Sequence, residues 1–377
     1  GFQSAALIAC DQDSITSGNP DDLRCSNVFG IGSVENNSGG AEYTSKAIYS
    51  QGTYDLTDAV SLTAGLRYTD DKTEGAVTDT IYKFPLAPPG EFAPPDPELT
   101  QVERRTPSAD TSKPTWLLGV DYTPEDDMML YAKYTRGYRQ GSVNIGGSTG
   151  LDTHGPESVD TYEIGTKTSF HGSMPATFNM ALFYNDFQDQ QIQFGYFNSA
   201  GVGTTGITNA GSSTIWGGEV EGNIQLTDNL IFSASYAYLH THVDELEFPP
   251  LPSTVLTGPN LTTVAGEPLP FAPENKLVLT ATYLLPVPAD LGSMRFGTTY
   301  VYTDQMQAVS ETVSPLGTMS DYNLVNLNFA WERVLESPVD LSVFVTNVTD
   351  EEYVTYVIGL WPYGVEGGAV GIPRMVG

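Results

Sequence analysis

Two histidines, His240 and His242, stand two residues apart and are followed by three acidic residues in the segment HTHVDELE. Imidazole nitrogens and carboxylate oxygens are ligands that divalent metals accept. Side chains two residues apart on a β-strand point to the same face, so a strand here would bring both rings together. The segment is therefore a candidate metal site; a charged rim at the end of a strand is the simpler interpretation.

Cationic and aromatic residues are the candidates for binding a ligand. Arg104 and Arg105 form an adjacent basic pair, and a guanidinium can hold a carboxylate or phosphate through two parallel hydrogen bonds. Nearby carboxylates outnumber the two arginines and could pair with them instead. Aromatic side chains could stack on a ligand or pack loops against one another, and the sequence leaves both open; they are Tyr82, Phe84, Phe194, Tyr196, Phe197, Trp361 and Tyr363.

Nothing in the sequence suggests covalent chemistry. It contains no Ser/His/Asp or Cys/His constellation, no Gly-rich phosphate loop and no paired-carboxylate motif, so we predict that the protein is not an enzyme and uses no cofactor. Its 46 acidic and 16 basic residues give a formal net charge of −30. Because nucleic acids are bound by clustered lysines and arginines, this charge argues against a nucleic-acid partner.

The elements that must position these residues are β-strands. Val60, Leu62, Ala64 and Leu66 alternate with polar residues, which is the pattern of a strand with one apolar and one polar face. The alternation recurs along the chain, and no apolar run is long enough for a transmembrane helix. We predict strands at 42–54, 59–70, 114–122, 128–139, 157–170, 175–188, 213–226, 229–242, 275–285, 293–304, 321–333 and 339–347, and a last strand from about residue 373.

The connections between the predicted strands alternate between short and long. The short ones are rich in Asp, Asn, Gly and Pro, as tight turns require. Outer-membrane barrels combine short periplasmic turns, long extracellular loops and strands of about 10 residues. We therefore predict an all-β fold, a transmembrane antiparallel β-barrel. A soluble barrel or sandwich gives the same alternation in single strands, but has no reason to place every long loop at one end.

Six segments, in order, resemble the C-terminal β-barrel of TonB-dependent outer-membrane receptors. The most informative are NAGSSTIWGGEVEGNIQLTDNLIFSASYAYLHT from Asn209, GEPLPFAPENKLVLTATYLLP from Gly266 and VDLSVFVTNVTDEEY from Val339. The others are SLTAGLRYT, YAKYTRGYRQGSVN and PESVDTYEIGTK. Together they cover the chain from about residue 42 to its end.

The resemblance implies that residues 1–377 are the C-terminal part of a 22-stranded barrel. The 13 predicted strands would be the last 13 of the 22, with residues 1–41 as an extracellular loop before them. The plug domain and TonB box of the family are not recognisable in this sequence, and the last strand has only just begun at Pro373. We therefore expect a fragment, or a chain seen in part.

The resemblance also implies a function. Receptors of this family lie in the outer membrane of Gram-negative bacteria, in contact with lipid and lipopolysaccharide. They bind a scarce large nutrient, most often a ferric siderophore, and import it with energy relayed by the TonB–ExbB–ExbD system through the plug. We expect the same of this protein; a structural or assembly barrel and a passive porin-like channel are the alternatives.

The two cysteines, Cys10 and Cys25, fall in the expected N-terminal loop. The outer membrane surface and the periplasm are oxidising, and cysteines there usually pair. We predict a disulfide that staples this loop, with two free thiols as the alternative.

Overall fold

Long β-strands joined by tight turns make up most of the described chain. The computed structural model describes residues 2–3, 8–10, 25–27, 33–83, 98–198, 203–261, 263–310, 316–360 and 365–377. The main sheet contains β1 (Phe2–Gln3), β4 (Ser33–Thr57), β5 (Val60–Lys83), β6 (Glu98–Arg105), β7 (Ser108–Glu125), β8 (Met128–Arg139), β11 (Glu157–Phe170), β12 (Ala176–Asn198), β13 (Gly203–Thr227), β14 (Leu230–Leu246), β15 (Val255–Leu261), β16 (Asn275–Leu284), β17 (Ser293–Thr303), β20 (Tyr322–Glu332), β21 (Leu341–Thr346) and β24 (Met375–Val376).

The remaining strands form four separate two-stranded hairpins. They are β2 (Ile8–Cys10) with β3 (Cys25–Asn27), β9 (Ser142–Val143) with β10 (Thr153–His154), β18 (Met306–Gln307) with β19 (Thr318–Met319), and β22 (Val354–Leu360) with β23 (Val365–Val370). Two short 3-10 turns, η2 (Ala289–Leu291) and η3 (Val334–Glu336), lie in connections. In the part of the chain described here, no helix is long and apolar enough to cross a membrane.

The 13 predicted strands are confirmed, as β4, β5, β7, β8, β11 to β14, β16, β17, β20, β21 and β24. Several are longer than the alternation indicated: β4 begins at Ser33, within the expected N-terminal loop, while β5 runs to Lys83 and β12 to Asn198. The extensions of β4 and β5 are rich in polar residues and the period-two pattern fades, whereas the extension of β12 keeps it, with Ile192, Phe194 and Tyr196 buried on one face. The extensions remain strands because the neighbouring strand still satisfies their backbone groups.

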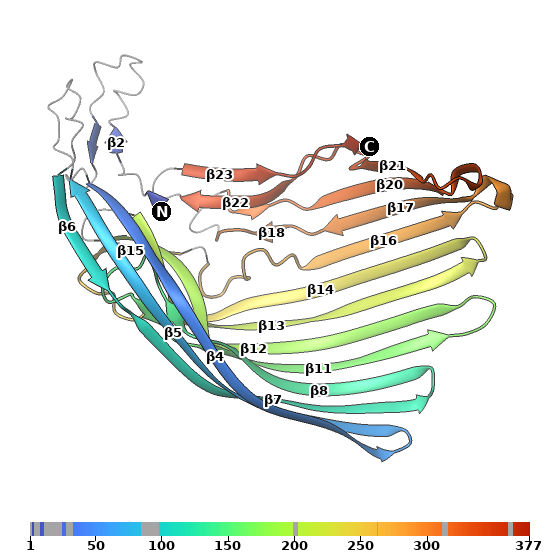
Figure 1. Ribbon diagram of the computed structural model, residues 1–377, viewed down its shortest axis with the longest axis horizontal. Coiled ribbons are helices and arrows are strands. Elements are labelled where there is room, and N and C mark those ends of the chain that lie inside the picture. The colour runs from blue at the N-terminus through green and yellow to red at the C-terminus, as the bar shows by residue number, and fades with distance from the viewer. Residues whose placement is uncertain are drawn as a thin grey trace.

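The sheet is an open, curved wall in which sequential strands pair antiparallel (Figure 1). Its order is β1-β4-β5-β7-β8-β11-β12-β13-β14-β16-β17-β20-β21-β24, with β6 beside β5 and β15 beside β12. Among the described residues, β24 pairs with β21 and no ladder joins it to β4. The fold is therefore a portion of an antiparallel β-barrel, as predicted.

All the short turns lie at one end of this wall, on the right in Figure 1, and we call it the turn end; the opposite end is the loop end. Two of the turns share the sequence Leu-Thr-Asp and the same bonding. The Thr57 hydroxyl accepts hydrogen bonds from the backbone N–H groups of Ala59 (3.2 Å) and Val60 (3.0 Å). The Thr227 hydroxyl does the same for the N–H groups of Asn229 and Leu230. A side chain that bonds the backbone ahead of it stabilises a tight turn.

The apolar face of the alternation points outward and is exposed. Leu118 and Ile164 have 53% and 56% of their surface exposed, and Leu182 and Val343 are similar. A soluble sandwich would bury this face in its core. On the described strands β7 to β14, this outer face carries no charged residue between the turn end and a row of aromatic side chains. Such a face suits contact with lipid hydrocarbon.

The aromatic row crosses six neighbouring strands at one level. Neighbouring rings in the row lie close together. Their centroid distances are 6.4 Å for Trp116–Tyr134, 4.9 Å for Tyr134–Tyr162, 6.5 Å for Tyr162–Tyr184 and 5.6 Å for Trp216–Tyr238. From Tyr162 to the turn end at Phe170, β11 has nine residues. At about 3.3 Å per residue this approaches the height of the apolar band of a membrane barrel, allowing for strand tilt.

The inner face is polar and its charges pair across strands. Lys133 Nζ lies 2.9 Å from Glu163 Oε1, which also accepts a 2.8 Å hydrogen bond from the Tyr131 hydroxyl. Asn179 Nδ2 donates to Glu221 Oε1 at 2.8 Å. A charge is tolerable on this side because it faces the lumen, whereas on the lipid side it would be costly.

Candidate functional site at the loop end

Residues 140–156, which connect β8 to β11, fold across the inner face of the sheet at the loop end; we call this segment the strap. On one side the Ser142 hydroxyl lies 3.4 Å from the Tyr43 hydroxyl of β4. On the other side the Thr204 hydroxyl of β13 donates to the Gly146 carbonyl at 2.9 Å. The strap therefore joins the wall of β4, β5 and β7 to the wall of β12 and β13.

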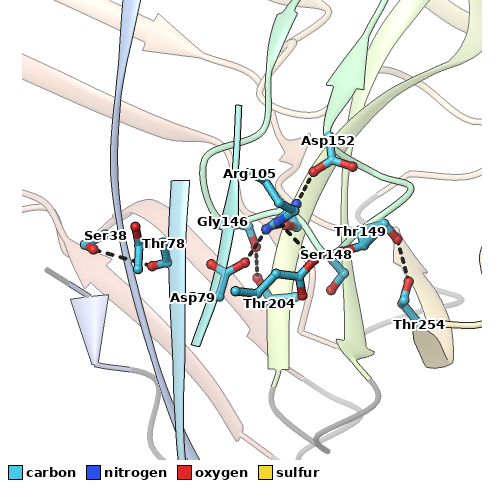
Figure 2. A network of polar contacts seen from close by, with 12 residues as sticks. Ser38, Thr78, Asp79, Arg105, Gly146, Ser148, Thr149, Asp152, Thr204 and Thr254 are labelled. Atoms are coloured by element: carbon cyan, nitrogen blue, oxygen red, sulfur yellow. Dashed lines mark hydrogen bonds and ion pairs between the residues drawn. The ribbon is translucent and has the colours of Figure 1, made fainter. Parts of the chain in front are cut away.

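Arg105, the last residue of β6, fixes the strap to β5 (Figure 2). Its guanidinium pairs with the carboxylates of Asp79 on β5 and Asp152 in the strap, and Nη2 donates to the Gly147 carbonyl at 2.6 Å. Glu103 Oε1 is 3.8 Å from Arg105 Nε. Only 10% of the Arg105 side chain and 9% of the Asp79 side chain are exposed. This is a largely buried ion network.

Burial dominates the electrostatics of this network. It raises the pKa of the Asp79 carboxyl above its ordinary value, although the hydrogen bond and charge of Arg105 act the other way. Burial would also lower the pKa of the Arg105 guanidinium, but its pairing with Asp79 and Asp152 more than offsets this and raises the pKa. Removing one partner would leave a buried charge uncompensated, which is expensive.

The buried amide of Asn144 is one of the groups that hold the strap to β13. Asn144 Nδ2 donates to the carbonyls of Leu151 (2.8 Å) and Ile207 (2.9 Å), while its Oδ1 accepts from the Ile207 N–H at 3.2 Å. The first bond closes the strap on itself, and the other two imitate a strand ladder. Asn144 is buried, so these bonds satisfy groups that water does not reach.

His154, near the end of the strap, is a buried titratable group. It is 8% exposed, and its Nδ1 has no hydrogen-bond partner among the described residues. Burial lowers the pKa of the His154 imidazole below its ordinary value, and the nearby Arg139 charge lowers it further, against a smaller opposing effect of Glu157. Both effects favour the neutral form of this imidazole over the charged form.

Aromatic side chains from β12 pack against the strap and form a small apolar core. Phe194 and Tyr196 are 1% and 0% exposed and stack with ring centroids 5.4 Å apart. Leu151 of the strap and Phe248 complete the contact. The Tyr196 hydroxyl accepts a 2.7 Å hydrogen bond from the N–H of Ser148. The core is thus tied to the strap by both packing and hydrogen bonds.

The contacts of the described residues bear on the two roles that the sequence left open, ligand binding and packing. Phe194 and Tyr196 pack against the strap, Phe197 is buried, and Arg105 pairs with carboxylates. Arg104 is exposed and makes no ion pair with a described residue. Tyr82 lies in the β4–β5 ladder opposite Val34. Phe84, Trp361 and Tyr363 lie outside the described residues.

The two histidines of the candidate metal site share the outer face of β14 but contact different groups. His240 Nδ1 is 3.6 Å from Glu274 Oε1 and its ring is 5.1 Å from that of Trp216, whereas His242 Nε2 is 3.9 Å from Asp244 Oδ1. Within the described ranges no three His, Cys, Asp or Glu side chains gather as a metal site would require. This arrangement is closer to a charged rim at the end of a strand than to a metal site.

The two cysteines occupy paired backbone positions in the β2–β3 hairpin. Cys10 and Cys25 are register partners in its antiparallel ladder. The Cα atoms of such partners are about 4.5–5.5 Å apart, within the range that a disulfide spans. The disulfide therefore stays a prediction, and the backbone spacing of the two cysteines is compatible with it.

The structure also draws attention to residues that the sequence did not single out. Arg67, Thr69, Asp71 and Tyr138 lie together at the loop end: the Arg67 Nε donates to the Thr69 hydroxyl at 2.9 Å, and the Tyr138 hydroxyl donates to Asp71. Arg67 and Thr69 fall on the polar face of a clear period-two segment. Period two predicts the face, but not which strands and loops surround it.

Comparison with known proteins shows which family has this architecture. A sequence model of the family described as "TonB dependent receptor-like, beta-barrel" matches residues 8–348. A probable TonB-dependent siderophore receptor, PiuA of Acinetobacter baumannii, is 25% identical over 257 residues, 64% of this chain and 30% of that protein. The pesticin receptor of Yersinia enterocolitica is 27% identical over 177 residues, 46% of this chain and 23% of that protein. The chain thus spans less than a third of these relatives.

Solved structures show the same fold. The ferric yersiniabactin uptake receptor FyuA of Yersinia pestis superposes with a TM-score of 0.70 at 18% identity, over 91% of this chain and 46% of that one. The siderophore receptor PiuA of Acinetobacter baumannii gives a TM-score of 0.57 at 16% identity, over 94% of this chain and 58% of that one. With the family match over most of its length, the chain belongs to the TonB-dependent receptor-like β-barrel family.

Proposed function

We propose that this chain is the barrel portion of a receptor in the outer membrane of a Gram-negative bacterium that imports a scarce nutrient, a ferric siderophore. The observation that carries the membrane part of the proposal is the uncharged, exposed outer face bounded by the aromatic row. The ligand part is supported by two of the similar proteins, PiuA and FyuA, which are named as a probable siderophore receptor and a ferric yersiniabactin uptake receptor.

Transport in this proposal is energised through TonB, ExbB and ExbD, which would act on the plug domain of the receptor. The chain contributes the lipid-facing wall, the lumen and the loop end. Outer-membrane lipid would contact the apolar face, and lipopolysaccharide would contact the charged surface beyond the aromatic row. The receptor carries out binding and rearrangement, with no covalent step.

Some ligand contacts proposed from the sequence remain open to a binding role. Arg104 is exposed at the loop end, and Tyr82 belongs to the last residues of β5. Phe84, Trp361 and Tyr363 are proposed as ligand contacts from the sequence alone. By contrast, Phe194, Tyr196 and Arg105 serve the packing of the strap, so we assign them a positioning role in holding the shape of the mouth.

The test is uptake of radioactive iron in the bacterium that encodes the chain. Deleting the gene should abolish the uptake of radioactive iron from at least one ferric siderophore. A plasmid copy of the gene should restore this uptake only when TonB is intact. Uptake that is unchanged by the deletion for every siderophore tried contradicts the iron proposal. Uptake that persists without TonB, together with ion conductance of the purified receptor in a planar bilayer, would indicate a passive channel instead.

A further inference from the structure

The inner wall has a hollow centred on Gly65, where β4, β5 and β7 lie side by side. Its volume is about 250 Å³. Gly65 has no side chain, and its register partners on the two neighbouring strands are Gln51 and Leu117. One ladder position nearer the loop end, Tyr49 and Thr115 flank Arg67 in the same way; all six of these residues line the hollow. Because side chains alternate between faces, these residues share the inner face.

Arg67 heads this hollow with its charge unpaired. Its side chain is exposed toward the lumen, and its Nε is held by the Thr69 hydroxyl at 2.9 Å, so the two terminal nitrogens remain available. No described carboxylate lies within ion-pair distance of it. Asp71, two positions further along the same face of β5, is buried and accepts the hydrogen bond of Tyr138.

A second cation lies next to Arg67. Lys113 on β7 is the register partner of Thr69 and therefore faces the same side, diagonal to Arg67. It too makes no ion pair with any described residue. Diagonal neighbours in an antiparallel sheet are about 7–8 Å apart, so the two positive charges repel each other. A bound anion would relieve this repulsion and supply the partner that both lack.

The position of the hollow suits a ligand that has entered from the loop end. On the opposite face of the same strands, Leu66 and Trp116 stand at the level of the aromatic row. Immediately beyond the hollow, Thr69, Asp71 and Thr73 are buried where the strap crosses β5. The hollow thus opens into the lumen just below the strap, at the membrane boundary, where a bound molecule would pass.

We propose that the Gly65 hollow is a subsite for an anionic oxygen-rich group, with Arg67 binding it through two hydrogen bonds and Lys113 adding charge. The Tyr49 hydroxyl and the Gln51 amide are further donors at its edge. Its volume fits one carboxylate or phenolate arm of a chelate and not a whole ferric complex. The inference rests on the proposed import function and narrows its ligand to an anionic chelate.

The test compares two charge-matched variants of the complete receptor. Arg67→Gln removes the cation of the hollow. Lys46→Gln removes one positive charge from the same sheet, but on the outer face, where Lys46 is the register partner of Asp70. Gly65→Leu fills the hollow without changing charge. Probes are ferric citrate, an anionic ferric tris-catecholate, a neutral ferric trihydroxamate and inorganic phosphate, with Kd measured by titration calorimetry.

We expect Arg67→Gln to raise the Kd of an anionic probe about 10- to 100-fold, as loss of a charge-assisted hydrogen bond does. Gly65→Leu should act in the same direction, Lys46→Gln should change Kd less than about twofold, and Arg67→Lys should restore part of the affinity. The Kd of a neutral probe should not change. Native-like melting of each variant shows that the receptor is folded.

The other outcomes separate the subsite from the proposed function. Equal affinities of Arg67→Gln and Lys46→Gln for an anionic ferric probe overturn the subsite and leave iron import standing. Arg67-dependent binding of phosphate without binding of any ferric chelate upholds the subsite and contradicts iron import. Absence of binding of every probe contradicts both. A lower melting temperature of ligand-free Arg67→Gln with unchanged Kd values means that Arg67 pairs within the receptor, and overturns the subsite.

Discussion

At the residue scale, Arg105 joins three parts of the chain through one side chain. Its guanidinium reaches Asp79 on β5, Asp152 in the strap and the carbonyl of Gly147. The same arginine could have captured an anionic ligand, but it is largely buried and its two terminal nitrogens pair with two carboxylates. The planar guanidinium suits this role because it offers five donors in fixed directions.

Arg105→Gln should loosen the strap, because it leaves the buried Asp79 carboxylate without a cation. The expected cost is about 3 kcal/mol of local stability, seen as faster hydrogen–deuterium exchange of residues 140–156. Arg104→Gln, at the exposed neighbouring position, is the matched control and should leave exchange unchanged. Equal effects of the two substitutions would mean that the network contributes little.

The closed strap should also weaken in acid, because of His154. Burial lowers the pKa of its imidazole when the strap is closed, so below about pH 6.5, the ordinary value, the open strap binds more protons. Stability of the closed strap is therefore full above this pH and falls as pH drops toward the lowered pKa. Exchange of residues 140–156, corrected for intrinsic rates, should rise between pH 7.5 and 5.5, and His154→Gln should remove the dependence.

The β2–β3 hairpin is expected to carry a disulfide between Cys10 and Cys25. Intact-mass analysis before and after reduction should show a gain of two hydrogens, and alkylation of the unreduced, unfolded protein should label neither cysteine. Labelling of both cysteines without reduction would show free thiols.

At the element scale, β13 depends on glycines to lie close to its neighbours. A Cβ on Gly217 would come within 2.1 Å of the Tyr238 backbone oxygen on β14 and 3.1 Å of the Phe183 ring on β12. The ladder between β13 and β14 continues through this position. The close approach explains why a residue without a side chain stands in the middle of a long strand.

Gly217→Ala should therefore destabilise the β12–β13–β14 unit by about 1–3 kcal/mol, since the backbone must shift. Gly52→Ala on β4 is the matched control, because a Cβ there meets nothing within 4 Å. Folding can be measured as the heat-dependent shift in gel mobility across a urea series. A midpoint for Gly217→Ala that equals that of Gly52→Ala would contradict the packing described.

At the scale of the whole molecule, the sheet separates two solvents. Its outer face is apolar up to the aromatic row, and its inner face holds paired charges. Ala234 and Ser235, adjacent on β14, point to opposite faces: Ala234 is opposite Gly222 and Leu279, while Ser235 is opposite Glu221. Substitutions at these two positions therefore test the lipid-facing side and the lumen-facing side of the sheet separately.

Ala234→Arg should cost about 2–4 kcal/mol of stability in a bilayer, because it places a cation in hydrocarbon. Ser235→Arg should be tolerated, because it faces the lumen beside Glu221. Unfolding free energies in lipid vesicles, from urea titration, measure both. If Ser235→Arg proved as costly as Ala234→Arg, the assignment of the two faces would be wrong.

The regular part of the fold was predictable because its physics is local. Alternation along Val60 to Tyr68 reflects a pleat that repeats every two residues, so strand and face follow from the residues themselves. Turn residues such as Thr57 act on the backbone next to them. The extension of β4 back to Ser33 escaped prediction because pairing with a neighbour, not a pattern within the segment, keeps it extended.

The site was less predictable, because its contacts join residues far apart in the chain. The sequence showed that Arg105, Phe194 and Tyr196 were cationic or aromatic, and that Arg67 lay on a polar face. Only the tertiary structure buries the first three under the strap and leaves Arg67 beside an open hollow. By itself the sequence determined the strands, their two faces and the alternation of turns and loops, since each arises within about ten residues. Which polar residues are used in packing and which remain free for a ligand was decided by the loops that fold back over the sheet.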